Sequence, residues 1–361
     1  MRIGILGGGQ LAMMMVSSAH KKYDIDFLVV DPADNPPASK YAKCIKMEYT
    51  DPKVLKLLSE ECDVVTIDFE NVPSNTLLEL QKFIKVHPNP RAVEICQDRL
   101  NEKTLFVENN IPTNEFFSID SEKDLKHSIK ELGCDSILKS RRFGYDGKNQ
   151  IIVGDKSIKQ VWKGIGEVPS ILEKKIDFLT EVSLIGVRLE SGETHFYPLV
   201  QNFHKDGILS ISIVPYKNSE LQQQAEAIHK KITELMNYVG VLVIEFFLTK
   251  NFQLLVNEMA PRVHNSGHWT IEGANLSQFE AHIRAISGMN IDNIETQGCA
   301  AMINLISKLP KKDVLNLDDE MYFYDYGKSE REKRKLGHIT IIDNDVKKIH
   351  TKLNNLNKKI T

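Results

Sequence analysis

The sequence predicts an α/β protein that starts with a doubly wound parallel sheet and continues into antiparallel α+β regions. The first observation is the alternation of short apolar strands with helical segments up to about residue 97, which is typical of βαβ units. The second is a pair of apolar, β-branched runs, Val241 to Thr249 and Leu254 to Met259. Lys250 to Gln253 separates these runs and has about the length of a hairpin loop. The chain therefore changes from parallel to antiparallel architecture along its length.

Composition limits the classes of function that need to be considered. The 361 residues, 26% charged and 42% hydrophobic, are typical of a globular protein with two or three domains. A net charge of −3 gives no sign of a nucleic-acid partner. Five scattered cysteines without a CxxC pair favour a reducing compartment over a disulfide framework or a zinc site. With neither a signal segment nor a membrane-length apolar run, we expect a cytoplasmic protein with no membrane partner.

The N-terminus combines a strand, a glycine-rich turn and a helix. The strand Arg2 to Leu6 leads into Gly7 to Ala12, a helical run to about His20, and a strand from Phe27 that ends at Asp31. This order passes the G-x-G-x-x-A fingerprint of dinucleotide-binding folds. The signal is weak alone, because a glycine-rich turn at a helix N-terminus binds any anion, including a sugar phosphate.

A further strand, Val64 to Phe69, is followed by the acidic residue Glu70. Ligands bind at the carboxyl ends of strands in open α/β sheets. The alternative is that Glu70 caps a helix, and the sequence favours neither interpretation.

The segment from residue 98 to about 172 has a different character. Asp98 opens a helix, and the strands Ser136 to Lys139 and Ile151 to Val153 enclose a loop, Ser140 to Gln150. This loop is rich in Arg, Lys and Gly, which suits a mobile, positively charged loop that binds a polyphosphate. It lacks the Walker G-x-x-x-x-G-K-[ST] pattern, and a glycine hairpin with surface lysines is the alternative.

The remaining elements are predicted from periodicity. Strands are expected at Ser170 to Ile176, from Glu181, at Thr194 to Leu199 and at Ile339 to Ile342, and helices at 220–238 and from about Ser277 to Ser287. The basic run from Tyr326 to His338 is either a solvated turn or a phosphate site between strands. The tail from Asp343 to Thr361 is expected to be a frayed helix.

The central hairpin carries the most informative side chains. If its strands pair antiparallel, Glu245 and Glu258 lie opposite each other on one face, where like charges are destabilising. A cation between them would remove the repulsion, and hard oxygen ligands suit Mg²⁺. Alternatively, one Glu faces solvent or pairs with a Lys. The loop after the hairpin, Ala260 to His268, brings an Arg, two His, an Asn and a Ser.

Together these pieces resemble the ATP-grasp superfamily and, within it, the family of 5-(carboxyamino)imidazole ribonucleotide synthetases (PurK). The resemblance covers nearly the whole chain and rests on GGGQL at 7–11, DFENV at 68–72, QDRLNEK at 97–103, GYDGK at 144–148, EVS at 181–183, EFF at 245–247, NEMAPR at 257–262, HNSGHW at 264–269 and KLGH at 335–338. The chain departs from the family pattern at Ala12, Ile67-Asp68, Asn149 and Val263. Asn149 replaces a glycine and could stiffen the phosphate loop.

The resemblance implies a three-domain ATP-grasp fold and a ligase reaction. The domains would be residues 1–97 (Rossmann-like), 98–172 (lid) and 173–361 (catalytic, with a small C-terminal β module), with ATP between the second and third. ATP would phosphorylate bicarbonate to carboxyphosphate. This would release CO₂ beside the exocyclic amine of 5-aminoimidazole ribonucleotide, giving the carbamate, ADP and phosphate. The resemblance also suggests Mg²⁺ as cofactor and a homodimer.

Site residues are carried over onto the matching positions. The implied nucleotide contacts are Arg99, Lys139, Gly144, Tyr145, Asp146, Gly147, Lys148, Asn149, Gln150, Glu173, Lys174, Lys175, Ile176, Glu181, His204, Asn257 and Glu258. Glu245 and Glu258 would hold Mg²⁺, and the implied catalytic residues are Tyr145, Asp146, Arg262 and His264. The implied ribonucleotide contacts are Gln10, Asn265, Ser266, Lys328 and Arg334.

One point of geometry limits this carry-over. Asn257 and Glu258 point to opposite faces of a regular strand, so Asn257 needs a bulge or must act through its backbone.

Two rivals remain. A different ATP-grasp ligase, such as a glycinamide ribonucleotide transformylase or a biotin carboxylase, should share the Glu pair but not GYDGK together with HNSGHW. A nucleotide-binding protein without turnover, or a dinucleotide-dependent oxidoreductase, belongs to another class. Hydride transfer has no use for paired carboxylates and a basic glycine loop.

Overall fold

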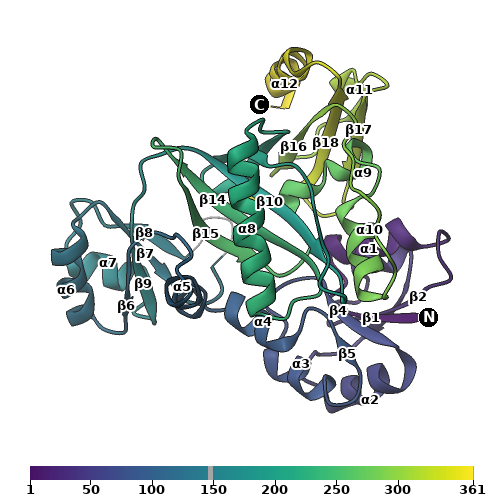
Figure 1. Ribbon diagram of the computed structural model, residues 1–361, viewed down its shortest axis with the longest axis horizontal. Helices are drawn as coiled ribbons and strands as arrows, with labels where there is room; N and C mark the ends of the chain where they lie inside the picture. The colour runs from purple at the N-terminus through teal and green to yellow at the C-terminus, as the bar shows by residue number, and fades with distance from the viewer. Residues whose placement is uncertain (145–148, 361) are drawn as a thin grey trace.

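The computed structural model describes residues 1–144 and 149–360, and the strands in these ranges form three sheets. Figure 1 shows the sheets following one another along the chain, with the N-terminal strands beside the late helix α10 (Gln278–Ile286). Within the described residues, no helix is both long and apolar enough to cross a membrane.

The first sheet is parallel, with strand order β3-β2-β1-β4-β5. Its strands are β1 (Arg2–Leu6), β2 (Asp26–Asp31), β3 (Lys43–Lys46), β4 (Val64–Ile67) and β5 (Lys85–Val86). Its helices are α1 (Gln10–Ala19), α2 (Pro52–Glu61), α3 (Ser74–Leu80) and α4 (Pro90–Cys96), with a 3₁₀ turn, η1 (Pro37–Lys40). Ile3 and Ile5 pack with α1, whereas Leu6 and Val65 pack with α2 and α3. Strands buried on both faces confirm the predicted doubly wound sheet.

One strand of this sheet is shorter than predicted. Strand β4 ends at Ile67, so Asp68 and Phe69 lie beyond it. The side chain of Asp68 turns back to accept hydrogen bonds from the backbone N–H groups of Gly9 and Ala12. This carboxylate thus ties the end of β4 to the N-terminus of α1, while the Asp68 N–H still donates to the Leu6 carbonyl of β1 at 2.9 Å.

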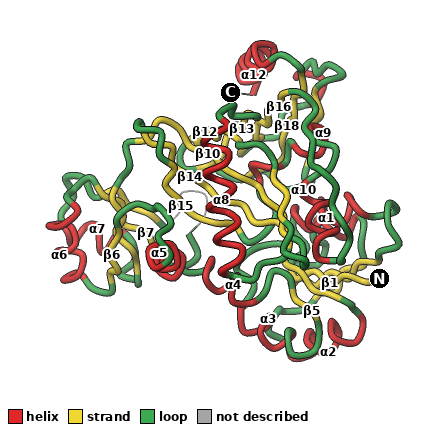
Figure 2. Tube along the Cα trace, viewed as in Figure 1, coloured by secondary structure: helices red, strands yellow, loops and turns green. Residues whose placement is uncertain are grey.

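The second sheet is antiparallel, with order β6-β9-β7-β8. It contains β6 (Phe116–Ile119), β7 (Ser136–Ser140), β8 (Gln150–Ile152) and β9 (Ser170–Lys174), and it follows α5 (Arg99–Glu108). Helices α6 (Glu122–Leu132) and α7 (Ile158–Gly164) share its core, and Figure 2 shows them on the outer side of the molecule. The expected continuation of β9 to Ile176 is wrong. The partner strand β7 starts at Ser136, opposite Lys174, so the ladder ends there.

The third sheet has nine strands, with order β15-β14-β10-β12-β13-β16-β18-β17 and β11 beside β10. Its strands are β10 (Phe178–Arg188), β11 (Thr194–Phe196), β12 (Val200–Lys205), β13 (Ile208–Val214), β14 (Gly240–Thr249), β15 (Leu254–Ala260), β16 (Cys299–Ile306), β17 (Met321–Asp325) and β18 (Lys335–Asp343). Helix α8 (Ser219–Leu235) packs with Leu184 and Ile244, and α10 packs with Ile185 and Val243. Because neighbouring residues of a strand face opposite sides, the two helices cover opposite faces of this sheet.

The C-terminal elements differ from their prediction. Strand β18 starts at Lys335, so the KLGH segment lies inside a strand that pairs with β16. The tail is not frayed but forms helix α12 (Val346–Ile360), after the short helices α9 (Thr270–Gly273) and α11 (Lys312–Leu315). Ile349, Leu353 and Leu356 of α12 are buried in one cluster with β16 and β18. Their helical spacing gives α12 an apolar stripe that a Lys- and Asn-rich composition hides.

Candidate active site

The hairpin of β14 and β15 brings two carboxylates face to face, as predicted. Glu245 and Glu258 are register partners, and the next pair is Phe246 with Val256. Asn257 is therefore the extra residue of a β-bulge, which is one of the two alternatives expected for it. Its side-chain Oδ1 is buried without a hydrogen-bond partner.

Each of the two carboxylates contacts a basic side chain. Arg99 Nη1 donates to Glu258 Oε2 at 2.6 Å, and His264 Nε2 lies 3.2 Å from Glu245 Oε1. Burial and the charge of Glu258 raise the pKa of Glu245 to about 7. Burial acts in the same direction on Glu258, but the charges of Arg99 and Lys139 hold its pKa below the ordinary value. Glu245 is thus the partner for which the neighbouring positive charges do not outweigh burial and the charge of Glu258.

The pair fits a magnesium site that is completed by ligands from outside the protein. In the part of the chain that the structure describes, no group of three His, Cys, Asp or Glu side chains is arranged to hold a metal. Mg²⁺ is commonly bound through one or two carboxylates together with water and substrate phosphates. Glu245 and Glu258 meet this requirement, and a cation would offset the repulsion that raises the pKa of Glu245.

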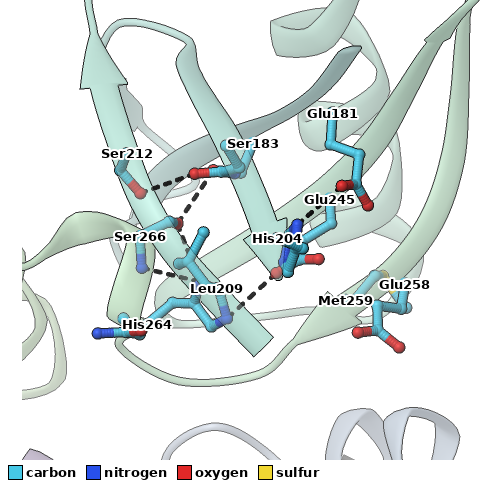
Figure 3. Close-up of polar contacts among 12 residues, drawn as sticks. Glu181, Ser183, His204, Leu209, Ser212, Glu245, Glu258, Met259, His264 and Ser266 are labelled. Atoms are coloured by element: carbon cyan, nitrogen blue, oxygen red, sulfur yellow. Dashed lines mark hydrogen bonds and ion pairs between the residues drawn. The ribbon is translucent and has the colours of Figure 1, made fainter. Parts of the chain in front are cut away.

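Glu181 and His204 lie beside the pair, on β10 and β12 (Figure 3). His204 Nδ1 is 2.8 Å from Glu181 Oε2. Burial alone would lower the pKa of His204, but the hydrogen bond to Glu181 and the charge of Glu245 raise it above its ordinary value. The structure therefore brings together two predicted nucleotide contacts and one predicted metal ligand.

The second sheet contributes a buried ion pair. Lys139 Nζ donates to Glu173 Oε2 at 2.8 Å, and Asn114 Nδ2 donates to the same oxygen at 3.0 Å. Burial raises the pKa of Glu173, but the charges of Lys139, Lys103 and Arg99 outweigh burial and lower it. The other oxygen of Glu173, Oε1, is buried without a partner.

The residues after Glu173 do not present their side chains to the site. Lys174 and Lys175 are exposed and lie 3.7 Å and 3.4 Å from surface carboxylates of Glu115 and Asp135. Ile176 is partly buried. Contacts from Lys174 and Lys175 to a nucleotide would therefore use the backbone.

The loop after β15 is held by a chain of hydrogen bonds. His264 Nδ1 accepts from the Ser266 N–H at 3.2 Å, which leaves the proton on Nε2 for Glu245. Ser183 Oγ lies 3.0 Å from Ser266 Oγ and accepts from Asn202 Nδ2 at 2.9 Å. Burial and the charges of Arg262 and Lys335 keep the pKa of His264 well below its ordinary value. His264 is thus a neutral imidazole with one defined tautomer.

Arg262 and Asn265 also have partners inside the protein. Arg262 Nε donates to Glu70 Oε2, and its Nη1 donates to the Val263 carbonyl at 3.0 Å. The first contact decides the role of Glu70, which pairs with Arg262 and does not cap α3. Asn265 and Asn304 exchange two side-chain hydrogen bonds, of 3.0 Å and 2.6 Å.

The predicted ribonucleotide contacts come from opposite ends of the chain. Lys328 Nζ donates to Gln10 Oε1 at 2.9 Å, across 318 positions of sequence. Gln10 Nε2 lies 2.9 Å from Nε2 of the buried His268. Arg334 donates to Ser329 Oγ at 2.9 Å, within its own turn. The structure joins Gln10 and Lys328, whereas the Arg334 side chain donates to Ser329 in its own turn.

The glycine-rich turn is occupied by carboxylates of the protein itself. Gly8 N–H donates to Asp31 Oδ2 at 2.7 Å, and Gly9 N–H donates to Asp68 Oδ2 at 2.8 Å. Ala12 N–H donates to Asp68 Oδ1 at 2.5 Å. These are the N–H groups that a dinucleotide pyrophosphate would need, so the geometry argues against the dinucleotide fingerprint.

Part of the predicted phosphate loop lies outside the described residues, namely Tyr145, Asp146, Gly147 and Lys148. Gly144, Asn149 and Gln150 flank this gap. Asn149 has a positive φ of 56°, and its Nδ2 donates to the Phe143 carbonyl at 3.2 Å. Asn tolerates this left-handed conformation better than most residues, which explains how it replaces the glycine of the family pattern.

Several residues near the site were missed by the sequence reasoning. They are Glu102, Lys103, Asn114, Ser183, Asn202, Lys335 and Asn304. Glu102 and Lys103 could have been found. They follow Arg99 at i+3 and i+4 within QDRLNEK, so all three side chains lie on one face of a helix. The polar network of Ser183 and Asn202 needs the strand register and had no sequence signal.

Comparison with protein families gives three matches along the chain. Residues 1–97 match the ribonucleotide synthetase preATP-grasp domain, and residues 104–279 match the ATP-grasp domain. Residues 300–352 match the phosphoribosylaminoimidazole carboxylase C-terminal domain.

Individual relatives agree with these matches. The N5-carboxyaminoimidazole ribonucleotide synthase of Pseudomonas aeruginosa is 40% identical over 342 residues, which cover 94% of each chain. The crystal structure of the synthetase from Thermus thermophilus has a TM-score of 0.94 and 38% identity, covering 99% of this chain and 98% of that one. The Aspergillus clavatus enzyme in complex with ADP and 5-aminoimidazole ribonucleotide has a TM-score of 0.90 and 28% identity, covering 99% and 98%.

Proposed function

The chain belongs to the family of N5-carboxyaminoimidazole ribonucleotide synthases, and we propose that its Glu245–Glu258 site is the catalytic centre of that reaction. The reaction is the ATP-dependent carboxylation of 5-aminoimidazole ribonucleotide to its N5-carboxy product, a step of purine biosynthesis. One observation carries the placement of the centre. The opposed carboxylates lie between basic residues suited to ATP phosphates, Arg99 and Lys139, and the loop that carries Arg262 and His264.

The nucleotide is proposed to lie between the second and third sheets. Lys139 would exchange its present partner, Glu173, for phosphate oxygens. Arg99 would keep its bond to Glu258 through Nη1 and donate to phosphate from its other guanidinium N–H groups. The loop from Gly144 to Gln150 would close over these phosphates. The backbone from Glu173 to Ile176 would hold adenine, Glu181 with His204 would hold the ribose, and Asn257 would add a contact from the bulge.

Glu245 and Glu258 are proposed to hold Mg²⁺, which would supply positive charge to offset that of the polyphosphate. The two carboxylates must then be ionised together, although they face each other in a buried place. Arg99 supports this on one side by neutralising Glu258. On the other side, His264 offers its Nε2 proton to Glu245.

The carboxyl group is proposed to come from bicarbonate. Bicarbonate would attack the γ-phosphoryl group to form carboxyphosphate, which releases CO₂ next to the exocyclic amine of the ribonucleotide. Arg262 is oriented by Glu70, and its guanidinium would stabilise the oxyanion that develops. His264, held neutral, would bind and orient the reacting groups through hydrogen bonds, together with Tyr145 and Asp146.

The phosphate end of the ribonucleotide is assigned to the contact between the first and third sheets. Gln10 and Lys328 meet there. Asn265, Ser266 and Arg334, like Lys328, belong to the part of the chain that follows β15. Lys328 carries the positive charge that a phosphate monoester requires.

The domain division is proposed as residues 1–97, 98–172 and 173–361. The first boundary separates the first two sheets, whereas the second falls inside β9 (Ser170–Lys174) of the second sheet. A cytoplasmic homodimer is part of the same proposal. The five cysteines are free thiols, which suits a reducing compartment.

The proposal is tested by measuring ADP release from ATP and bicarbonate, with and without 5-aminoimidazole ribonucleotide. We expect ADP release that depends on the ribonucleotide, on bicarbonate and on Mg²⁺, with formation of the carbamate. Equal turnover with glycinamide ribonucleotide and formate, or with biotin, would assign the chain to another ATP-grasp activity. Nucleotide binding without turnover under any of these conditions would contradict the assignment of an enzyme.

A further inference from the structure

Helix α5 presents three charged side chains to strand β15, and only Arg99 has a proposed role so far. Arg99, Glu102 and Lys103 have the spacing i, i+3 and i+4, so they share one face of the helix. Glu102 is 2% exposed and Lys103 is fully buried. Glu and Lys side chains are rarely buried to this extent without specific partners.

Glu102 and Lys103 bind backbone groups on the outer edge of β15, and Lys103 Nζ also donates to Thr113 Oγ1 at 2.8 Å and to Asn114 Oδ1 at 2.7 Å. This strand is the last one in the sheet order, and no named strand of the described residues pairs with its outer side. An isolated parallel bridge joins Thr113 to Val256, whose N–H donates to the Pro112 carbonyl at 2.8 Å. Met259 N–H donates to Glu102 Oε1 at 2.6 Å. The Val256 carbonyl accepts from Lys103 Nζ at 3.2 Å and from Thr113 Oγ1 at 2.7 Å. Helix α5 and Thr113 thus take the place of a neighbouring strand.

These anchors lie on both sides of the bulge residue Asn257 and of Glu258. Val256 precedes the bulge, and Met259 follows Glu258. Shifting a strand by one residue turns every side chain to the other face of the sheet. Without the bulge, Asn257 would oppose Glu245, and Glu258 would point away from it. The backbone around Glu258 is therefore held in the arrangement that makes the carboxylates face each other.

We propose that Glu102 is a positioning residue for the metal-holding carboxylate Glu258, acting with Lys103 and Thr113 by fixing the bulged edge of β15. The inference rests on the proposed function, because a positioning role for Glu102 requires that Glu245 and Glu258 hold the metal. Arg99, from the same face of α5, binds the Glu258 carboxylate itself. One helix therefore sets both the backbone and the side chain of Glu258.

A role in stability alone accounts poorly for this arrangement. Buried charged groups are often no more stabilising than well-packed apolar residues of similar size, because ions lose hydration on burial. An apolar pair could join α5 to β15 without the hydrogen bonds to Met259 N–H and the Val256 carbonyl. Glu102 and Lys103 add control of backbone position through these hydrogen bonds, which packing alone specifies less sharply.

The test compares Glu102→Ala with Glu102→Gln, which keeps an acceptor oxygen for the Met259 N–H. Residues that orient metal ligands typically change metal affinity or activity by about 10- to 100-fold when replaced. We expect Glu102→Ala to raise the half-saturating Mg²⁺ concentration for ADP release by at least about tenfold. Glu102→Gln should stay close to the wild type. Thr113→Val, which removes one hydrogen bond to the Val256 carbonyl, should show a smaller rise.

A second readout does not depend on turnover. ADP binding is measured by calorimetry with and without MgCl₂ for each variant. Glu102→Ala should bind ADP as the wild type does without MgCl₂ but should lose most of the gain that MgCl₂ provides. Glu280→Gln is the matched control, since Glu280 is also buried and paired, with Lys22, Tyr23 and Arg284, but lies on α10. It should lower thermal stability without changing the response to MgCl₂.

The outcomes separate this inference from the proposed function. A wild-type protein whose ADP binding and turnover ignore MgCl₂ would refute the metal proposal itself. A wild type that responds, together with a folded Glu102→Ala variant whose response is unchanged, would overturn the positioning role. If Glu102→Ala does not fold, Thr113→Val decides: a rise in the half-saturating Mg²⁺ concentration supports the role, and an unchanged value rejects it.

Discussion

At the scale of single residues, the site is a set of charges that satisfy one another in the structure described. Arg99 pairs with Glu258, Lys139 with Glu173, Arg262 with Glu70, and His204 with Glu181. Each pair joins a proposed ligand-binding residue to a carboxylate. Substrate binding would replace the partner of Lys139 with phosphate oxygens, while Arg99, Arg262 and His204 would keep their carboxylate partners and donate to the substrates from their remaining N–H groups. The unbound enzyme therefore avoids leaving buried charges uncompensated.

Glu258→Gln is expected to abolish turnover while the fold survives. The substitution removes one of two proposed metal ligands and the partner of Arg99. A bound metal supplies several kcal/mol of charge stabilisation, so ADP release should fall on the order of a hundredfold or more. ADP release at saturating Mg²⁺ and circular dichroism are the measurements. The exposed Glu234→Gln on α8 is the control, and a folded Glu258→Gln variant with normal turnover would remove the metal assignment.

Lys328→Ala and Arg334→Ala are expected to weaken 5-aminoimidazole ribonucleotide much more than ATP. Losing a charged hydrogen bond to a phosphate costs about 1.5–3 kcal/mol, roughly ten- to hundredfold in affinity. Steady-state titration of each substrate with the other saturating measures the two Michaelis constants. The exposed Arg331→Ala, from the same turn, should leave both unchanged. A higher Michaelis constant for ATP alone would place this basic cluster in the nucleotide site.

At the scale of elements, function depends on irregularities at the ends and edges of regular structure. The bulge in β15 sets the face to which Glu258 points. The N-terminus of α1 has no side-chain cap of its own, and Asp68, from beyond β4, accepts from the N–H groups of Gly9 and Ala12. A Cβ atom on Gly9 would collide with Asp68 Oδ2, so only glycine allows this approach. Asp68, at the end of β4, thus occupies the N–H groups at the α1 N-terminus that bind a phosphate in dinucleotide-binding folds.

The glycine-rich turn is therefore expected to bind no dinucleotide. Asp31 and Asp68 already accept the hydrogen bonds of this turn, and their negative charges repel a pyrophosphate. Calorimetric titration with NAD and with NADP should show no saturable heat, while ADP in the same buffer serves as the positive control. Saturable NAD binding that disappears in Gly9→Val would contradict this expectation and show that the turn is a dinucleotide-binding site.

At the scale of the whole molecule, the site needs all three sheets to be held in one arrangement. Gln10 comes from the first sheet region, Lys139 and Glu173 from the second, and Glu245 from the third. The first and third are joined by α1 packing on α10 and by His282. His282 Nδ1 accepts from the Val241 N–H at 3.1 Å, and Nε2 lies 2.9 Å from Thr66 Oγ1. One buried imidazole thus links β4 to the start of β14, the strand that carries Glu245.

His282 is expected to make stability fall in acid. Burial and the charge of His87 lower the pKa of His282 from 6.5 to about 3. As pH falls below 6.5, His282 takes up a proton in the unfolded chain, whereas in the folded protein it stays neutral until about pH 3. The contribution of neutral His282 to the free energy of unfolding is therefore complete above pH 6.5 and is lost as pH falls toward 3. The slope it adds approaches about 1.4 kcal/mol per pH unit.

Urea unfolding of the wild type and of His282→Gln between pH 7 and 4 measures this contribution. The variant should be less stable at pH 7 but should lose less stability on acidification. His350→Gln, at an exposed position of α12, is the control. Equal slopes for the wild type and His282→Gln would show that His282 is protonated at the same pH in the folded and unfolded chains.

The sequence by itself determined the fold class, the hairpin and the opposition of Glu245 and Glu258. These features depend on local patterns, namely alternating strands and helices, two β-branched runs and a short loop, and such patterns are readable along the chain. Strand geometry, applied to the nucleotide contact that the family resemblance implied, also predicted that Asn257 either lies in a bulge or acts through its backbone, and the structure has the bulge. Local composition was misleading for α12, because its Lys and Asn residues mask the stripe of Ile349, Leu353 and Leu356.

Only the tertiary structure decided which distant residues meet. The contact of Gln10 with Lys328, the pairing of Glu70 with Arg262 and the anchoring of β15 by Glu102 and Lys103 each join segments more than 150 positions apart. No periodicity encodes such contacts, because they arise when separate sheets pack and buried polar groups must find partners. For the same reason, the glycine-rich turn looked like a phosphate site until packing placed Asp31 and Asp68 against it.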